Sequence, residues 1–78
     1  MPVGGRGVTE VSDLNEAKEV VLSYIEREFT MYGHLIQERL RMEGIHISNV
    51  FVNQALRELV KEGQIIERAA DSVPYYHI

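Results

Sequence analysis

Polar side chains that can pair with the edges of nucleic-acid bases recur along one segment of the chain, residues 48–63. Asn49, Asn53 and Gln54 carry amides that both donate and accept hydrogen bonds, and Arg57 carries a planar fork of donors. Such amides can form paired hydrogen bonds with adenine, and arginine can do so with guanine. The chemistry that this segment predicts is therefore recognition of bases. The alternative is the polar side of an ordinary surface helix.

The same segment predicts one complete helix, at about residues 48–62. Ser48 suits the N-cap, because its hydroxyl can accept a hydrogen bond from a backbone N–H of the first turn. Gly63 suits the position after the last turn, where glycine adopts a left-handed conformation without a steric clash. Apolar residues at helical spacing define an inward face: Val52, Ala55, Leu56, Leu59 and Val60.

A second amphipathic helix is predicted earlier in the chain, at about residues 13–28. Asp13 and Glu16 have the spacing of a capping box, with Asp13 at the N-cap. The apolar residues that follow fall at helical spacing: Leu14, Ala17, Val20, Val21, Tyr24, Ile25 and Phe29. Residues 1–12 are expected to form a flexible N-terminal arm, since they are rich in glycine and show no periodic apolar pattern.

Between these two helices the sequence predicts a third, at about residues 34–43, ending before Gly44. Its expected inward residues are Leu35, Ile36, Leu40 and Met42. Residues 29–32 favour a brief strand or a turn. Residues 45–47 are expected to form a tight connector whose two isoleucines fill the junction.

A β-hairpin is predicted at the C-terminal end, with strands at residues 64–69 and 73–78 and turn residues between them. Pro74 places the second strand at a sheet edge, or places the proline near the start of that strand. Tyr75 and Tyr76 are adjacent, so in a strand they point to opposite faces. One of the two is expected to pack on the core.

The order helix, short β segment, helix, helix, hairpin resembles the winged-helix variant of the helix-turn-helix, over about residues 13–78. The most specific part is residues 55–67, in which the last helix ends in glycine and leads into a strand. The resemblance implies an α+β winged-helix fold whose third helix lies in a major groove of double-stranded DNA. It also implies a set of DNA-binding residues: Ser48, Asn49, Asn53, Gln54, Arg57, Lys61, Arg39, Arg41 and Arg68.

No subfamily is assigned. The Z-DNA-binding winged-helix domains carry an asparagine in the third helix and a proline followed by an aromatic residue in the wing. Asn53 and Pro74, with Tyr75 or Tyr76, resemble this arrangement. Those domains also place a tyrosine and a lysine on the third helix, where this chain has Arg57 and Asn49. A winged-helix protein of the small ribosomal subunit shows a similar pattern but is strongly basic, as binding to rRNA demands.

The charge distribution limits how tightly one copy of the chain can hold DNA. The formal net charge is −4, with three basic and six acidic residues in residues 1–30 and five basic and six acidic residues in residues 31–78. Affinity that depends on neutralising phosphates is therefore small for a monomer. We expect a homodimer, formed through the first helix and the N-terminal arm, that doubles the contact with DNA. The alternative function is a protein-interaction winged helix in a larger assembly, which binds its partner through the acidic first helix or through the wing.

Other classes of function are disfavoured by composition. The 78 residues suit one domain, and the absence of cysteine rules out disulfides and thiolate metal sites. No apolar run approaches the roughly 18–20 residues of a membrane span, and the N-terminus lacks a signal-peptide pattern. His34 and Glu38 lie one helical turn apart but have no third metal ligand nearby. We therefore expect a cytoplasmic transcriptional regulator without metal, cofactor or enzymatic activity.

Overall fold

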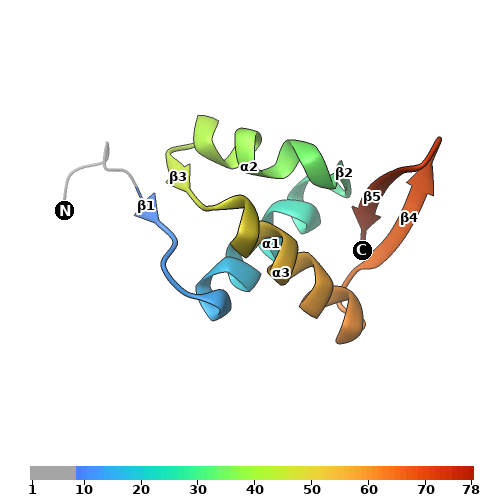
Figure 1. Cartoon of the computed structure of the whole chain (residues 1–78), viewed down its shortest axis with the longest axis horizontal. Coiled ribbons are helices and arrows are strands. Elements are labelled where there is room, and N and C mark those ends of the chain that lie inside the picture. Colours follow the sequence, from blue (N-terminus) through green and yellow to red (C-terminus); the bar gives the residue numbers. More distant parts are fainter. Residues whose placement is uncertain (1–8) are drawn as a thin grey trace.

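Three helices and a three-stranded antiparallel sheet make up most of the computed structural model, which describes residues 9–78 (Figure 1). The helices are α1 (Leu14–Glu28), α2 (Gly33–Met42) and α3 (Asn49–Lys61). The strands of the sheet are β2 (Thr30–Tyr32), β4 (Ile66–Ala70) and β5 (Val73–His77). The predicted α+β class is confirmed, and each predicted helix lies within a residue of its observed bounds. No described helix combines the length and the apolar character that crossing a membrane requires.

Both ends of α1 are set by local chemistry. The Asp13 carboxylate accepts a hydrogen bond from the Glu16 N–H at 2.8 Å, and the Glu16 side chain accepts from the Ser12 N–H at 3.1 Å. These contacts satisfy donors that the first turn leaves unpaired. At the other end Phe29 adopts a φ of 69°, so the chain leaves the helical path there. The prediction that Phe29 faces inward is wrong, because this turn leaves its side chain 75% exposed.

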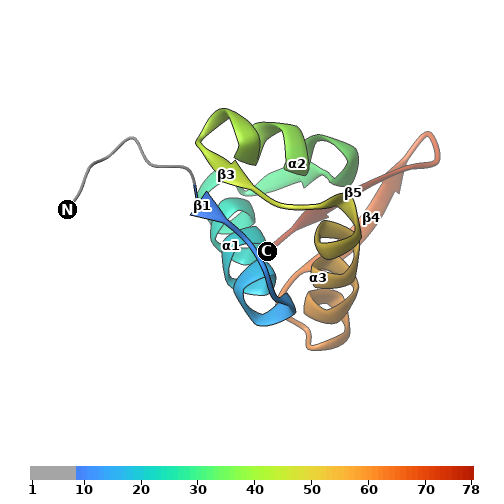
Figure 2. The ribbon, with the colours of Figure 1, turned by 60° about the vertical axis from the view of Figure 1, so that its left-hand side comes forward.

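The core lies where α1 packs against α3, with α2 lying across them (Figure 2). Its largest fully buried side chains come from all three helices: Ile25, Ile36, Leu40, Val21 and Val52. Met42 was expected to join this core but is 77% exposed. It follows Leu40 by two residues, which puts it on nearly the opposite side of α2. Gly44 then ends the segment with a φ of 85°.

A second, two-stranded sheet was not predicted. β1 (Thr9–Glu10) pairs in parallel with β3 (Ile45–His46), and the Val11 N–H donates to the His46 carbonyl at 2.8 Å. This pairing buries Val11 and Ile47, and Ile45 is partly buried beside them. Of the predicted flexible arm, residues 1–8 lie outside the described residues, whereas residues 9–11 are fixed against β3.

The three-stranded sheet has the order β2-β5-β4, and its two faces differ. Met31, Tyr76 and Glu67 form one row across the strands, with Met31 and Tyr76 in the core. The next row, Tyr32, Tyr75 and Arg68, lies on the opposite face because side chains alternate along a strand. The expected split between the two adjacent tyrosines is thus confirmed, with Tyr76 as the core residue.

The β4–β5 hairpin closes through two residues, Asp71 and Ser72, whose φ values are 52° and 69°. Positive φ at both central residues is typical of the type I′ turn that suits two-residue hairpins. β5 is the central strand, yet Pro74 lies beyond the end of β2 and pairs only with Ala69 of β4. This confirms the expectation that the proline sits near the start of its strand.

Candidate nucleic-acid interface

The rotation of α3 about its axis is fixed by its buried face. Val52, Ala55, Leu56 and Leu59 are all buried against the rest of the core. The rest of the helix surface faces solvent, and every predicted base-reading or phosphate-binding residue of α3 lies on it: Asn49, Asn53, Gln54, Arg57 and Lys61. These five side chains are exposed, so each is accessible to a partner.

Ser48 has a structural role at the start of this helix. Its side-chain oxygen accepts a hydrogen bond from the Phe51 N–H at 3.1 Å, as an N-cap does. The hydroxyl hydrogen is not used in that contact. Ser48 can therefore still donate one hydrogen bond to a partner while it caps α3.

Val50 is an exposed apolar residue on the same face that sequence analysis did not single out. Its side chain is 64% exposed. It lies three and four residues before Asn53 and Gln54, so the three side chains are neighbours on the helix surface. A helical projection of residues 48–62 would have shown this, because Val50 falls opposite the buried stripe.

A recess of about 230 Å³ separates α3 from the three-stranded sheet. Asn53 and Arg57 line it from the helix, and Glu67 and Tyr76 line it from the sheet. The Tyr76 hydroxyl donates to the Glu67 carboxylate at 3.1 Å. Burial, together with this hydrogen bond, raises the pKa of Tyr76 to about 12, while the positive charge of Arg57 acts in the opposite direction.

The charged side chains divide into two groups. Salt bridges within residues 9–78 use only two of the basic residues, Lys18 and Arg27. Lys18 of α1 pairs with Glu62, and Arg27 pairs with Glu28 and Glu43. The five basic residues of the predicted DNA-binding set form no salt bridge with any described residue: Arg39, Arg41, Arg57, Lys61 and Arg68. Arg57 and Lys61 could instead have paired with Glu58 and Glu62 along α3, but no such ion pair forms among the described residues.

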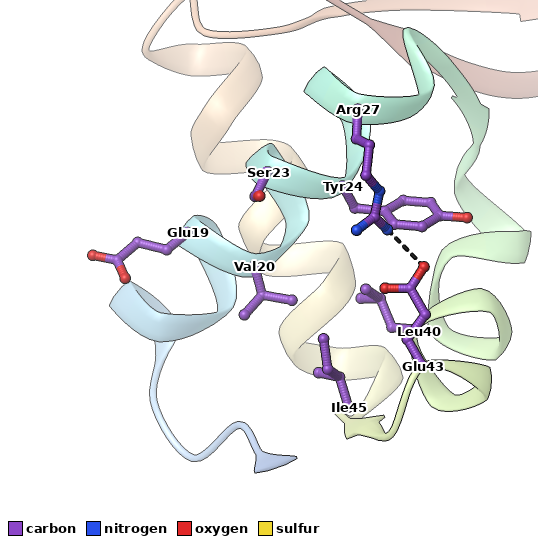
Figure 3. Close-up of a pocket in the computed structure, with 8 residues that line it drawn as sticks. All are labelled: Glu19, Val20, Ser23, Tyr24, Arg27, Leu40, Glu43 and Ile45. Atoms are coloured by element: carbon purple, nitrogen blue, oxygen red, sulfur yellow. Dashed lines mark hydrogen bonds and ion pairs between the residues drawn. The ribbon is translucent and has the colours of Figure 1, made fainter. Parts of the chain in front are cut away.

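Figure 3 shows the groove between α1 and the end of α2, where one of the salt bridges lies. The Arg27 guanidinium donates to the Glu43 carboxylate at 2.6 Å, and its central carbon lies 5.0 Å from the centre of the Tyr24 ring. The hydrogen bond with Glu43 is the main cause that raises the pKa of Arg27. Arg27 therefore links α1 to the end of α2, and the carboxylate of Glu43 already neutralises its charge.

Arg68 lies apart from α3. It belongs to the row of Tyr32 and Tyr75, whereas Glu67 belongs to the row of the core residue Tyr76 and lines the recess beside α3. Arg68 donates instead to the ring of His77, with 3.2 Å between the Nε and Nε2 atoms. The alternation of side chains along β4 thus points Arg68 away from the recess beside α3, and it remains a residue of the predicted wing.

The two arginines of α2 are also separated. Arg39 lines a cavity between α2 and the sheet, together with Tyr75 and Ala70. Arg41 is two residues further on, so it points to the other side of the helix and lines no cavity with Arg39.

An aromatic row on the outer face of the sheet was also missed by sequence analysis. The rings of Tyr32 and Tyr75 have centroids 5.8 Å apart and meet edge to face. His34 and His77 extend the row, with centroids 5.8 Å from Tyr32 and 6.3 Å from Tyr75. The sequence indicates only that Tyr75 and Tyr76 point to opposite faces of a strand. It does not show that Tyr32 pairs with Tyr75, because residues 29–32 favour a strand or a turn equally.

Among residues 9–78 no three His, Asp or Glu side chains come together in a way that could hold a metal ion.

Comparison with models of protein families, with curated proteins and with solved structures finds no match to this chain. The functional proposal for the candidate interface therefore rests on the residues of this chain.

Proposed function

We propose that this chain is a winged-helix domain that binds double-stranded DNA through α3 and acts as a small transcriptional regulator. The element order supports the winged-helix assignment: apart from the short pair β1 and β3, it is α1, β2, α2, α3, β4, β5, with the β4–β5 hairpin as the wing. One observation carries the functional proposal. The exposed face of α3 combines amides with cations that have no salt bridge within the described chain, while the basic residues of α1 are paired.

In this proposal the N-terminal half of α3 reads base edges in the major groove. Asn49, Asn53 and Gln54 supply paired donors and acceptors, which suit adenine. Arg57 contacts guanine or a phosphate, and Lys61 contacts a phosphate. Ser48, Arg39 and Arg41 add donors at the flanks. Arg68 stays outside this set, because it points away from α3.

Binding to a mixed-sequence duplex across a salt series tests the proposal, with fluorescence anisotropy as the measurement. Each phosphate that is neutralised contributes about −0.9 to the slope of log K against log salt. A monomer that uses Arg57, Lys61 and the arginines of α2 should give a slope of about −2 to −4. No binding by the folded protein at low salt would contradict the proposal.

A matched pair of variants shows whether α3 is the binding element. Arg57→Gln removes an exposed cation that has no salt bridge, and we expect it to weaken DNA binding and to reduce the salt slope by about one. Arg27→Gln removes the same charge from the groove of Figure 3, where Glu43 already matches it. DNA binding should change much less in the Arg27 variant. Equal losses in the two variants would mean that net charge alone governs binding.

A homodimer is part of the proposal, since one copy offers few phosphate contacts. The exposed side of α1 carries Glu19 and Glu26, so two copies that meet there bring like charges together. Dimerisation through α1 should therefore strengthen as salt rises, because screening reduces this repulsion. Sedimentation equilibrium at low and high salt measures this directly. A mass that stays that of one chain in both conditions contradicts the dimer.

The second candidate function is a protein-interaction domain. It is favoured by large apolar side chains that the fold leaves in solvent, above all Phe29 and Met42, which are each more than two-thirds exposed. Their positions at the ends of α1 and α2 lie outside the exposed face of α3. This function would be supported if duplex DNA failed to bind.

A further inference from the structure

A largely apolar cavity, open to solvent on one side, lies between the first half of α2 and the sheet. It has a volume of about 450 Å³ and is lined by Thr30, Met31, Tyr32, Leu35, Arg39, Ala70 and Tyr75. This volume falls in the range of roughly 300–1,000 Å³ that is usual for small-molecule sites. The proposed contact with DNA uses one lining residue of this cavity, Arg39, and none of its apolar or aromatic lining residues.

Two features of the lining define what could fill it. Tyr32 and Tyr75 meet edge to face at one side, and such rings offer edges and faces on which a planar ring can pack. Arg39 is the sole charged residue of the lining, and it forms no salt bridge with residues 9–78. A guanidinium without a carboxylate partner favours an anion, which it can bind through two parallel hydrogen bonds.

The other cavities lack this combination. The groove of Figure 3 contains Arg27, but Glu43 is hydrogen-bonded to it there. The recess beside α3 contains Arg57 together with the carboxylate of Glu67. A third, between α1 and the end of α3, holds Lys18 with its salt-bridge partner Glu62. Of these four cavities, the one next to α2 is alone in having a cation, aromatic rings and no acidic side chain among its lining residues.

We infer that this cavity binds a small molecule composed of a planar aromatic ring and one anionic group, such as a phosphate or a carboxylate. The ring packs against Tyr32 and Tyr75, and the anion pairs with Arg39. Leu35, Met31 and Ala70 supply the apolar surface that the ring covers. The ligand-binding site does not depend on DNA binding, because none of the cavity's contacts involves α3.

Binding of the ligand and the proposed binding of DNA would nevertheless be coupled. Arg39 is also a proposed phosphate contact, so a ligand anion and a DNA phosphate compete for one guanidinium. Each ligand must then weaken the binding of the other by the same factor. Such a ligand would act as an effector of the proposed regulator.

Three probes separate the contributions of the ring and the charge: phenyl phosphate has both, inorganic phosphate has the charge alone, and benzyl alcohol has the ring alone. Binding is followed by the amide shifts of the ¹⁵N-labelled chain. Phenyl phosphate should bind with a dissociation constant of about 1 mM or below and should shift the amides of Tyr32, Leu35 and Tyr75. The other two probes should bind at least about tenfold more weakly, since each lacks one of the two contacts.

Arg39→Gln is the decisive variant, and Arg41→Gln is its control, because both arginines are exposed on α2 and only Arg39 lines the cavity. We expect Arg39→Gln to weaken the binding of phenyl phosphate at least about tenfold and to leave the binding of benzyl alcohol unchanged. Arg41→Gln should leave the binding of all three probes unchanged. The inference is overturned if phenyl phosphate gives no saturable shift, or if it binds the Arg39 variant as tightly as the native chain. The spectrum of each variant shows directly whether it is folded.

Discussion

Lys18 of α1 forms a salt bridge with Glu62, the residue that follows α3. Along the sequence, Glu62 stands next to Lys61 and five residues after Arg57, where it would reduce the positive charge of a DNA-binding face. In the fold it faces α1 instead. The pair thus ties two helices together and removes one carboxylate from the neighbourhood of the cations on α3.

The salt bridge should make a small contribution to stability. The side chains of Lys18 and Glu62 are 22% and 41% exposed, and partly exposed pairs are typically worth about 0.2–1 kcal/mol. A double-mutant cycle on Lys18→Ala and Glu62→Ala, read by urea unfolding, should give a coupling energy in that range. The same cycle on Lys61 and Glu62 should give a value near zero. A larger coupling for Lys61 would mean that Glu62 turns toward the DNA-binding face.

Phe29 offers a test of backbone strain. Its φ of 69° is unfavourable for a residue with a Cβ atom, and its exposed ring makes little use of the core. We expect Phe29→Gly to be more stable than Phe29→Ala by about 1 kcal/mol, because both remove the ring but only glycine relieves the strain. Thermal and urea unfolding of the two variants measure the difference. Equal stability, or a more stable alanine variant, would show that Phe29 does not hold this conformation in solution.

The helices could be predicted because their signals are local. Asp13, Ser48 and Gly63 mark helix ends through contacts within a few residues, and apolar spacing reveals the buried stripe of each helix. The two-stranded sheet could not be predicted. β1 and β3 are two residues each and are joined by a pairing across more than thirty residues, which leaves no periodic pattern in either segment.

Only the part of the candidate site on α3 could be predicted, because the sequence distinguishes the buried face of that helix from its exposed face. The exposed face of α3 follows from its apolar spacing, whereas the face of the sheet on which Arg68 lies depends on the register of β4 with β5. A one-residue change in register moves a side chain to the other face of a sheet. The cavity beside α2 was missed for a similar reason, since its lining combines residues of α2 and all three strands of the sheet.

Tyr76 should make the fold sensitive to alkaline pH. Its folded-state pKa is raised to about 12 from an ordinary value of 10, first by burial and then by the hydrogen bond to Glu67. The folded state thus holds the phenol proton more tightly than the unfolded chain does. The associated stability is fully present below pH 10 and is lost as the pH rises through 12.

The measurement is the urea midpoint of the native chain and of Tyr76→Phe at several values between pH 8 and pH 12. The native chain should lose more stability than the variant over the upper half of this range. The difference between the two curves isolates Tyr76 from the other tyrosines, which titrate in both proteins. Parallel curves would contradict a raised pKa for Tyr76.

Val50 should contribute to the choice of DNA sequence if α3 reads the major groove. Its exposed side chain lies beside Asn53 and Gln54, and an apolar group at such a position can contact the methyl group of thymine. In a duplex selected from random sequence, uracil can replace each thymine in turn, which removes only that methyl group. One replacement should weaken binding about fourfold, corresponding to about 0.8 kcal/mol for one buried methyl-sized group. Val50→Ala, which keeps the helix intact, should bind the thymine and uracil duplexes equally. If the native chain binds the selected duplex but no uracil weakens it, Val50 does not read thymine, while DNA binding by α3 still stands.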